Sequence, residues 1–169
     1  MNQRTFLRLI DPIQDKIYRL ALRLLTSKES AQDASQEIIL KLWNHNNKLK
    51  DYANIEAFVM TMTKNYCLDQ LKSKQNSNVK IVHNNYESRE KSSYEQLEIK
   101  DEFEHIDKIL DALPHQQKLI FQLRDVEQYE YEEISKITKM NETAIRVALS
   151  RVRKKIREEL LKTHRYGIN

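Results

Sequence analysis

The scarcity of glycine and proline constrains this chain more than any other feature of its sequence. The 169 residues include one Gly and two Pro. Tight turns with a positive φ angle usually need glycine, and proline interrupts helices, so a chain poor in both favours helices. Charged residues make up 32% of the chain and apolar residues 40%, which is enough for one buried stripe on each helix. The composition therefore predicts an all-α protein made of small helical bundles.

The same residue counts exclude several classes of functional site. Phosphate-binding loops, the dinucleotide fingerprint and the nucleophile elbow each need several glycines at fixed offsets, and this chain has only Gly167. A single cysteine, Cys67, excludes an internal disulfide framework or a multi-cysteine zinc site and indicates a reducing compartment. The five histidines do not form an HExxH pair. We therefore expect no cofactor, no metal and no enzymatic activity.

Hydropathy gives no sign of a membrane segment. No apolar stretch approaches the roughly 18 to 20 residues that a membrane-spanning helix requires. The first ten residues are polar and basic before a short apolar run, and no small-residue cleavage site follows them. The expectation is a cytoplasmic protein that does not insert into a membrane.

Residues 1–75 carry three apolar stripes at helical spacing, which predict a first helical domain. Asp11-Pro12 resembles a helix start, with an N-cap acceptor before a proline at the first helical position. Thr26 and Ser27 are expected to end that helix and to cap the next. The second stripe ends at the polar residues 45–48, and Asn54 is expected to cap the third helix.

A second domain is expected over residues 101–169. From residue 76 to residue 100 the apolar pattern lapses into Ser, Asn, Lys and Glu, which predicts a flexible linker. Periodicity returns at Phe103, and Pro114 is expected to end the first helix of this domain. Further helices are expected over 116–126, 131–139 and 142–162.

The last two of these helices form a helix-turn-helix pattern. They are joined by a short break at Met140-Asn141, where Asn141 is expected to take the left-handed conformation. Residues 134–169 hold ten basic and three acidic residues, whereas residues 101–133 hold three basic and ten acidic ones. The second helix of such a motif enters the DNA major groove. The alternative is an ordinary helix pair with a solvated basic face. The expected inner seam is Ile134, Ile137, Ile145 and Leu149.

The start of the second helix is expected to read bases, and the rest of it to contact phosphates. Arg146, Val147 and Ser150 should lie opposite the seam, near the helix start, where base edges are reached. Basic residues further along suit phosphate oxygens, which give affinity rather than sequence discrimination. The expected DNA-contacting set is Thr143, Arg146, Val147, Ser150, Arg151, Lys154 and Lys155, with Arg153 and Arg157 continuing the basic run.

Several sequence segments resemble the extracytoplasmic-function sigma factors of the sigma-70 superfamily. Residues 113–127 (LPHQQKLIFQLRDVE), 131–134 (YEEI) and 150–156 (SRVRKKI) are similar to their region 4. Residues 33–43 (DASQEIILKLW) and 57–69 (AFVMTMTKNYCLD) are similar to their region 2. The resemblance implies a minimal two-domain sigma factor that binds core RNA polymerase and promoter DNA and directs initiation. Family members are often held inactive by an anti-sigma factor.

The resemblance also implies roles for particular residues. It assigns polymerase docking to Asp33, Gln36, Glu37 and Lys41, for which ordinary solvent exposure, or a cap-like role of Asp33, is the alternative. It assigns recognition of the minus-ten element to Lys64, Asn65, Asp69 and Lys72, together with the loop over residues 45–54. A hydrogen bond between Asn65 and Asp69 is the alternative there. It assigns the minus-thirty-five element to the helix-turn-helix set. Trp43 and Phe58 are expected to be core residues.

Two other classes of protein remain as rivals. A helix-turn-helix regulator that binds a palindromic operator as a dimer would explain residues 101–169, but it leaves the patterns around Asp33 and Asn65 as coincidences. A helical enzyme is supported by little more than the presence of His, Asp and Glu, because no spaced acid-base or metal constellation appears in the sequence.

Overall fold

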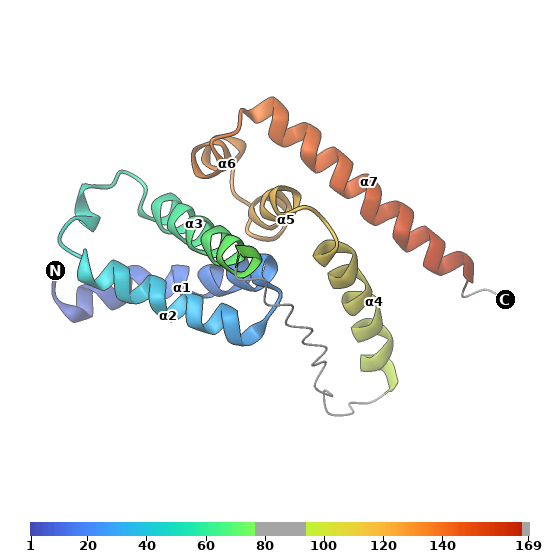
Figure 1. Cartoon of the computed structure of the whole chain (residues 1–169), viewed down its shortest axis with the longest axis horizontal. Coiled ribbons are helices and arrows are strands. Elements are labelled where there is room, and N and C mark those ends of the chain that lie inside the picture. The colour runs from blue at the N-terminus through green and yellow to red at the C-terminus, as the bar shows by residue number, and fades with distance from the viewer. Residues whose placement is uncertain (77–93, 167–169) are drawn as a thin grey trace.

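The computed structural model describes residues 1–76 and 94–166, with side chains over 1–75 and 103–163. Every regular element in these ranges is helical, as the composition predicted (Figure 1). Residues 1–76 form an N-terminal unit and residues 94–166 a C-terminal unit. Most of the segment expected to be a linker lies outside the described residues. Its last part, 94–100, belongs to a helix.

The N-terminal unit is a bundle of three helices, α1 (Gln3–Leu25), α2 (Lys28–Asn44) and α3 (Ile55–Asn76), with a short 3-10 turn at Leu49–Asp51. The expected caps are confirmed. Thr26 ends α1 in the left-handed conformation with φ 57°, which lets its backbone N–H reach the carbonyl of Leu22. The Ser27 hydroxyl accepts from the N–H of Ser30 at 3.2 Å. Asn54 Oδ1 accepts from the N–H of Ala57 at 2.9 Å, which caps α3.

The start of α1 was predicted wrongly. The helix begins at Gln3, where Asn2 Oδ1 accepts from the N–H of Thr5 at 2.9 Å, and Pro12 lies inside it. Proline inside a helix loses one backbone hydrogen bond. Burial of Phe6 and Ile10, which are 3% and 2% exposed, extends the apolar stripe upstream and offsets that loss. The Phe6 ring also packs edge-on against Trp43, with 5.1 Å between ring centroids.

The C-terminal unit consists of α4 (Tyr94–Asp111), α5 (His115–Phe121), a π-helical turn at Gln122–Val126, α6 (Tyr131–Thr138) and α7 (Glu142–Tyr166). Pro114 separates α4 from α5, as expected. Figure 1 shows α7 as a long helix that runs along one side of the molecule beyond α6 and α5. The helices α6 and α7 form the helix-turn-helix, whose inner seam is confirmed because Ile134, Ile137, Ile145 and Leu149 are all buried.

The turn between α6 and α7 differs from the prediction. Lys139, with φ 59°, takes the left-handed conformation that was expected at Asn141. Its backbone N–H reaches the carbonyl of Ser135, which ends α6. Asn141 instead caps α7, because its Oδ1 accepts from the N–H of Ala144 at 2.8 Å. The chain uses its Asn where a side-chain acceptor is needed, and a lysine carries the positive φ angle in place of glycine.

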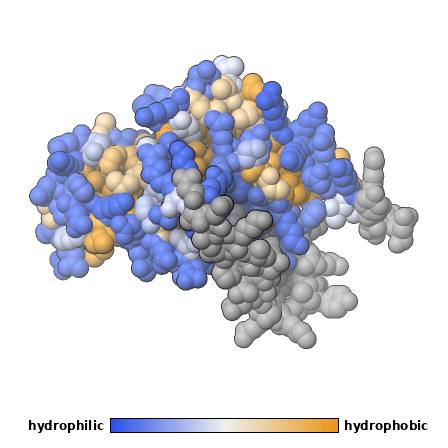
Figure 2. All heavy atoms as spheres, viewed as in Figure 1, coloured by the Kyte–Doolittle hydropathy of each residue, from blue (hydrophilic) through white to orange (hydrophobic). Residues whose placement is uncertain are grey.

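The two units share one hydrophobic core. The shared core contains buried residues of α1, α2 and α3 together with residues of α5, α6 and α7, so neither unit closes its apolar face alone. Contacts between α3 and α6 and between α1 and α5 form the junction. On the face shown in Figure 2, hydrophilic residues cover most of the surface, and hydrophobic residues show through in smaller patches. Large members of this core are Leu20, Leu24, Met60, Leu119, Ile120, Leu123, Ile134 and Ile137.

Candidate nucleic-acid interface

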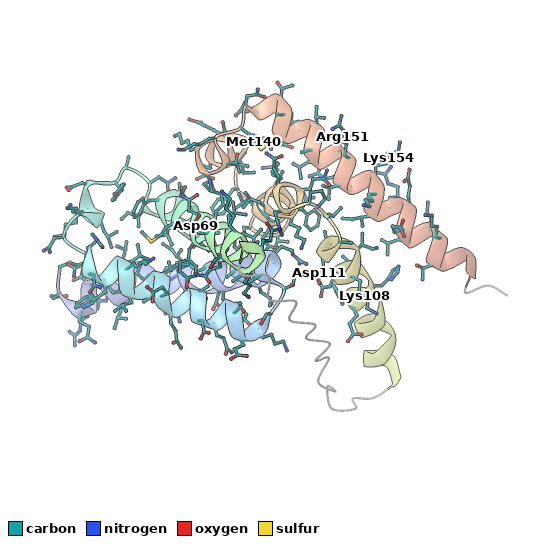
Figure 3. All side chains as sticks on the ribbon, viewed as in Figure 1. Asp69, Lys108, Asp111, Met140, Arg151 and Lys154 are labelled. Atoms are coloured by element: carbon teal, nitrogen blue, oxygen red, sulfur yellow. The ribbon has the colours of Figure 1, made fainter. Side chains whose placement is uncertain are left out.

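The exposed face of α7 carries the residues that were expected to contact duplex DNA. Ile145, Leu149 and Val152 point into the core and are at most 1% exposed. At 100° per residue, Val147 and Lys154 lie nearly opposite this seam. Val147 is 45% exposed. Figure 3 shows Arg151 and Lys154 pointing away from the rest of the molecule. All of the residues predicted to contact DNA are exposed: Thr143, Arg146, Val147, Ser150, Arg151, Lys154 and Lys155.

Two arginines of α7 lie on the flank of this face and contact the protein itself. The guanidinium carbon of Arg146 is 4.3 Å from the centre of the Tyr131 ring, and its Nη1 is 3.8 Å from Glu142. Arg153 donates from Nε to Asp125 Oδ2 at 3.0 Å, and its second terminal nitrogen reaches Oδ1. That hydrogen bonding to Asp125 raises the pKa of Arg153. In this arrangement a bidentate ion pair occupies the guanidinium of Arg153, so the expected phosphate contact would have to compete with Asp125.

A groove of about 530 Å³ lies beside the start of α7. The first turn of α5 forms one side of it, and the turn before α7 and the first two turns of α7 form the rest. Sequence spacing gave no sign that Gln116 and Gln117 adjoin this face, since more than twenty residues separate them from Asn141. The lining residues are Gln116, Gln117, Met140, Asn141, Thr143, Ala144, Val147, Ala148 and Arg151.

The exposed face of α3 holds three of the four residues expected to contact the minus-ten element. Asn65, Asp69 and Lys72 follow one another at helical spacing and are all exposed. Figure 3 labels Asp69 on this helix. Within residues 1–75 and 103–163, no hydrogen bond joins Asn65 to Asp69, so the alternative interpretation of this pair has no support.

Lys64 differs from the other three residues. Its side chain is buried, with 8% of the residue exposed, and Nζ donates to the backbone carbonyl of Ile137 in α6 at 2.8 Å. Burial, together with the nearby charge of Lys139, lowers the pKa of Lys64. In this closed arrangement α6 covers Lys64, so the predicted minus-ten contact of Lys64 would require its bond to Ile137 to break.

The loop between α2 and α3 is held by apolar and aromatic contacts. Leu49 is fully buried. The Tyr52 ring stacks on Phe58 with 3.9 Å between centroids and 17° between planes, and Tyr52 remains 41% exposed. Trp43 and Phe58 are half-buried and pack against the N-terminal core, as expected. The loop thus presents one exposed aromatic ring beside the start of α3.

One face of α2 is polar and exposed. Asp33, Gln36 and Lys41 are exposed and Glu37 is half-buried, at positions that share one side of the helix. Ser27 caps α2, so the cap-like role considered for Asp33 has no support. Leu40, which was not among the predicted residues, lies between them and is 53% exposed. In the sequence, Leu40 falls outside the apolar stripe of α2. That position could have identified it as an exposed apolar residue on this face.

Sequence comparison assigns both units to one family. The pattern of sigma-70 region 2 matches residues 9–77, and that of sigma-70 region 4 matches residues 103–156. The chain belongs to the sigma-70 family. Its content of regions 2 and 4, in that order, agrees with the extracytoplasmic-function group.

Two relatives support this placement. One, described as a probable RNA polymerase sigma factor RfaY of Xanthomonas campestris pv. campestris, is 22% identical over 165 residues. That match covers 94% of this chain but 41% of the relative, so this chain spans less than half of that protein. The other is a solved structure of the sigma factor RpoE in complex with the anti-sigma factor NepR from Bartonella quintana, with a TM-score of 0.76 and 19% identity. The match covers 93% of this chain and 97% of the solved one, and it supports the assignment of the fold.

Polar contacts reinforce the junction between region 2 and region 4. The Tyr129 hydroxyl donates to Glu56 Oε1 at 2.6 Å, and Lys16 donates to the same oxygen. Burial disfavours the Glu56 carboxylate, but the hydrogen bonds from Lys16 and Tyr129 outweigh it and lower the pKa of Glu56. Arg19 makes a bidentate pair with Glu127 at 2.7 and 2.8 Å. Region 4 is thus bound to region 2 through charged groups as well as through the core.

Neither a metal-binding cluster nor a membrane-spanning helix occurs within residues 1–76 and 94–166. In that part of the chain, no three His, Cys, Asp or Glu side chains gather where they could hold a metal ion. None of the helices described there is both long and apolar enough to cross a membrane. Cys67 is buried, and burial raises the pKa of its thiol to about 12.

Proposed function

We propose that this chain acts in the cytoplasm as a promoter-specificity subunit of RNA polymerase, with no catalytic chemistry of its own. The observation that supports this most is the order of the two family regions, 9–77 and 103–156, on one chain. Each region presents an exposed polar or basic helix face beside a tightly packed core. An anti-sigma factor is a further proposed partner, because the structurally similar RpoE was solved in complex with one.

The proposed polymerase contact is the face of α2. Asp33, Gln36, Glu37 and Lys41 form it, and the exposed Leu40 adds an apolar centre. A polar rim around an apolar side chain is the usual composition of a protein interface. Lys41 is preorganised, because its ammonium lies 5.0 Å from the centre of the Tyr66 ring.

The proposed minus-ten contact is the face of α3 with the loop before it. Asn65 and Asp69 offer an amide and a carboxylate, which match adenine and cytosine respectively. Lys72 is exposed at the end of this face, where we propose that it contacts a phosphate. Lys64 joins this set only when α6 moves away from α3, since its ammonium is otherwise bound to the Ile137 carbonyl.

The proposed minus-thirty-five contact is the start of α7. Thr143, Arg146, Val147 and Ser150 lie in its first turns, where a recognition helix reaches base edges. Arg151, Lys154 and Lys155 follow as phosphate contacts. The neighbouring groove, lined also by Gln116 and Gln117, brings α5 to the edge of this surface.

Run-off transcription with core polymerase on a library of genomic promoters tests the proposed function. The full chain should produce transcripts from a defined subset of promoters, and core polymerase alone should not. If the chain instead binds a palindromic duplex as a stable dimer and gives no transcripts, it is an operator-binding regulator.

We expect Glu37→Lys to weaken binding to core polymerase by about tenfold or more, because a reversed charge in an interface meets repulsion. Pull-down or fluorescence titration at moderate salt measures the affinity. The matched control is Asp11→Lys, which makes the same kind of charge reversal at an exposed position of α1 away from this face. If the two variants bind core polymerase with equal affinity, Glu37 is not part of the docking surface.

We expect Asn65→Ala to impair strand opening by about 1–3 kcal/mol while leaving closed-complex binding nearly unchanged, because Asn65 is proposed to read a base only after the strands separate. Permanganate reactivity of thymines reports the open bubble, and gel shift reports the closed complex. Gln14→Ala removes an exposed amide from α1 and serves as the control. A normal bubble with Asn65→Ala would argue against this site.

A further inference from the structure

The aromatic ring of Tyr131 lies between arginines from two elements. The guanidinium carbon of Arg124, in the π-helical turn, is 4.5 Å from the ring centre, and that of Arg146, in α7, is 4.3 Å from it. After its ion pair with Asp125, Arg153 also owes part of its raised pKa to Tyr131. The ring of Tyr131 therefore faces two guanidinium groups, those of Arg124 and Arg146.

The Tyr131 ring restrains the side chain of Arg146 more strongly than its ion pair with Glu142 does. Its other partner is Glu142, an (i, i+4) pair at 3.8 Å in which both side chains are about half exposed. Exposed pairs of this kind restrain a side chain weakly. An aromatic face at 4.3 Å attracts the cation and limits the directions that the guanidinium can take.

Tyr131 is itself held in place. It is the first residue of α6, and the backbone N–H of Glu130 just before it donates to Glu133 Oε2 at 3.1 Å. Its ring is partly buried against the shared core. Arg124, which contacts the same ring, is also fixed, because it donates to the backbone carbonyl of Tyr129 at 2.8 Å.

We propose that Tyr131 is a positioning residue that orients Arg146 for base reading. A contact with an aromatic ring uses none of the N–H donors of the guanidinium, so these stay available for O6 and N7 of a guanine. Orienting the side chain in the free protein also reduces the entropy lost on binding DNA. This inference rests on the proposed function, because it gives Arg146 its reading role at the minus-thirty-five element.

The test compares Tyr131→Leu, Tyr131→Phe, Arg146→Ala and the double variant Tyr131→Leu/Arg146→Ala in the full chain. Binding is measured to duplexes that carry the preferred minus-thirty-five sequence and each of its single-base changes, at several salt concentrations. Tyr131→Leu should reduce discrimination by about two- to tenfold at the base pair that Arg146→Ala affects, with an unchanged salt slope. Tyr131→Phe should keep the discrimination, because it keeps the ring. The double variant should equal Arg146→Ala.

Two outcomes would overturn the proposal. One is that Tyr131→Leu weakens all duplexes alike, and the other is that its effect adds fully to that of Arg146→Ala. Thermal melting identifies any loss of fold, and Tyr131→Phe provides the ring without the hydroxyl. If the wild-type chain binds no promoter duplex and supports no transcription, the proposed function has failed instead.

A measurement without DNA distinguishes a failure of the Tyr131 proposal from a failure of the proposed function. The Nε–H signal of Arg146, assigned with Arg146→Lys, should be shifted by the ring current of Tyr131 in the nuclear magnetic resonance spectrum of the free chain. The shift should persist in Tyr131→Phe and disappear in Tyr131→Leu. An identical Arg146 signal in all three proteins would show that the ring does not hold the guanidinium, whatever the chain binds.

Discussion

Replacing Tyr129 with alanine should lower the free energy of unfolding by about 3–5 kcal/mol, the usual effect of truncating a buried aromatic residue. Tyr129 is 6% exposed and packs in the core shared by the two regions, and its hydroxyl donates to Glu56 of α3. The variant loses the ring from the core and leaves the Glu56 carboxylate without one of its donors. Chemical denaturation of the full chain measures the change.

Two control variants separate the ring of Tyr129 from its hydroxyl. Tyr52→Ala removes a 41% exposed tyrosine of region 2 and should cost only about 1 kcal/mol. Tyr129→Phe loses only the hydrogen bond to Glu56. Because the folded-state pKa of Glu56 is lowered, that bond contributes above the unfolded pKa of about 4.5 and is lost as the pH falls through the folded value. Equal effects of Tyr129→Ala and Tyr52→Ala would contradict the bridging role of Tyr129.

Replacing Arg146 with alanine should relax base preference at one position of the minus-thirty-five element, by about 1–3 kcal/mol of discrimination. Neutralising Lys154 or Lys155 should instead weaken binding to all sequences about equally and reduce the salt slope by about one for each lysine that meets a phosphate. Lys154 lies two turns beyond Arg146 on the outer side of α7 (Figure 3). Binding to single-base duplex variants over a range of salt concentrations distinguishes the two behaviours.

Two results would change which residues of α7 are assigned to base reading and which to phosphate contact. If Arg146→Ala weakens every duplex uniformly and lowers the salt slope, Arg146 contacts a phosphate. If Lys154→Ala changes the preference at one base pair, the base-reading turn lies further along α7 than proposed.

Local signals in the sequence predicted most helix ends and the seam of the helix-turn-helix. Ser27 and Asn54 are short polar residues before apolar stripes, and each caps the helix that follows. Ile145 and Leu149 are four residues apart in an amphipathic pattern, and both are buried. Such features depend on a few neighbouring residues, so they can be recognised without knowledge of the fold.

Apart from the turn before α7, the features that the sequence did not predict involve contacts between distant parts of the chain. Pro12 lies inside α1 because Phe6 upstream packs on Trp43. Lys64 is covered because its donor meets a carbonyl 73 residues away, and Arg153 pairs with Asp125 28 residues away. The spacing of residues along one helix gives the face on which a side chain lies, but not the element that covers that face. The shared core was missed for the same reason, because each stripe could have closed its own bundle.

The buried lysine at the junction links the affinity of a ligand to the separation of the two regions. A ligand that needs the Lys64 ammonium binds only molecules in which its bond to Ile137 is broken. The apparent dissociation constant then equals the intrinsic one divided by the fraction of molecules already separated. Each 1.4 kcal/mol by which the closed form is favoured weakens apparent binding about tenfold. Substitutions at the junction that leave the proposed DNA-contacting residues unchanged should therefore change promoter affinity without altering sequence preference.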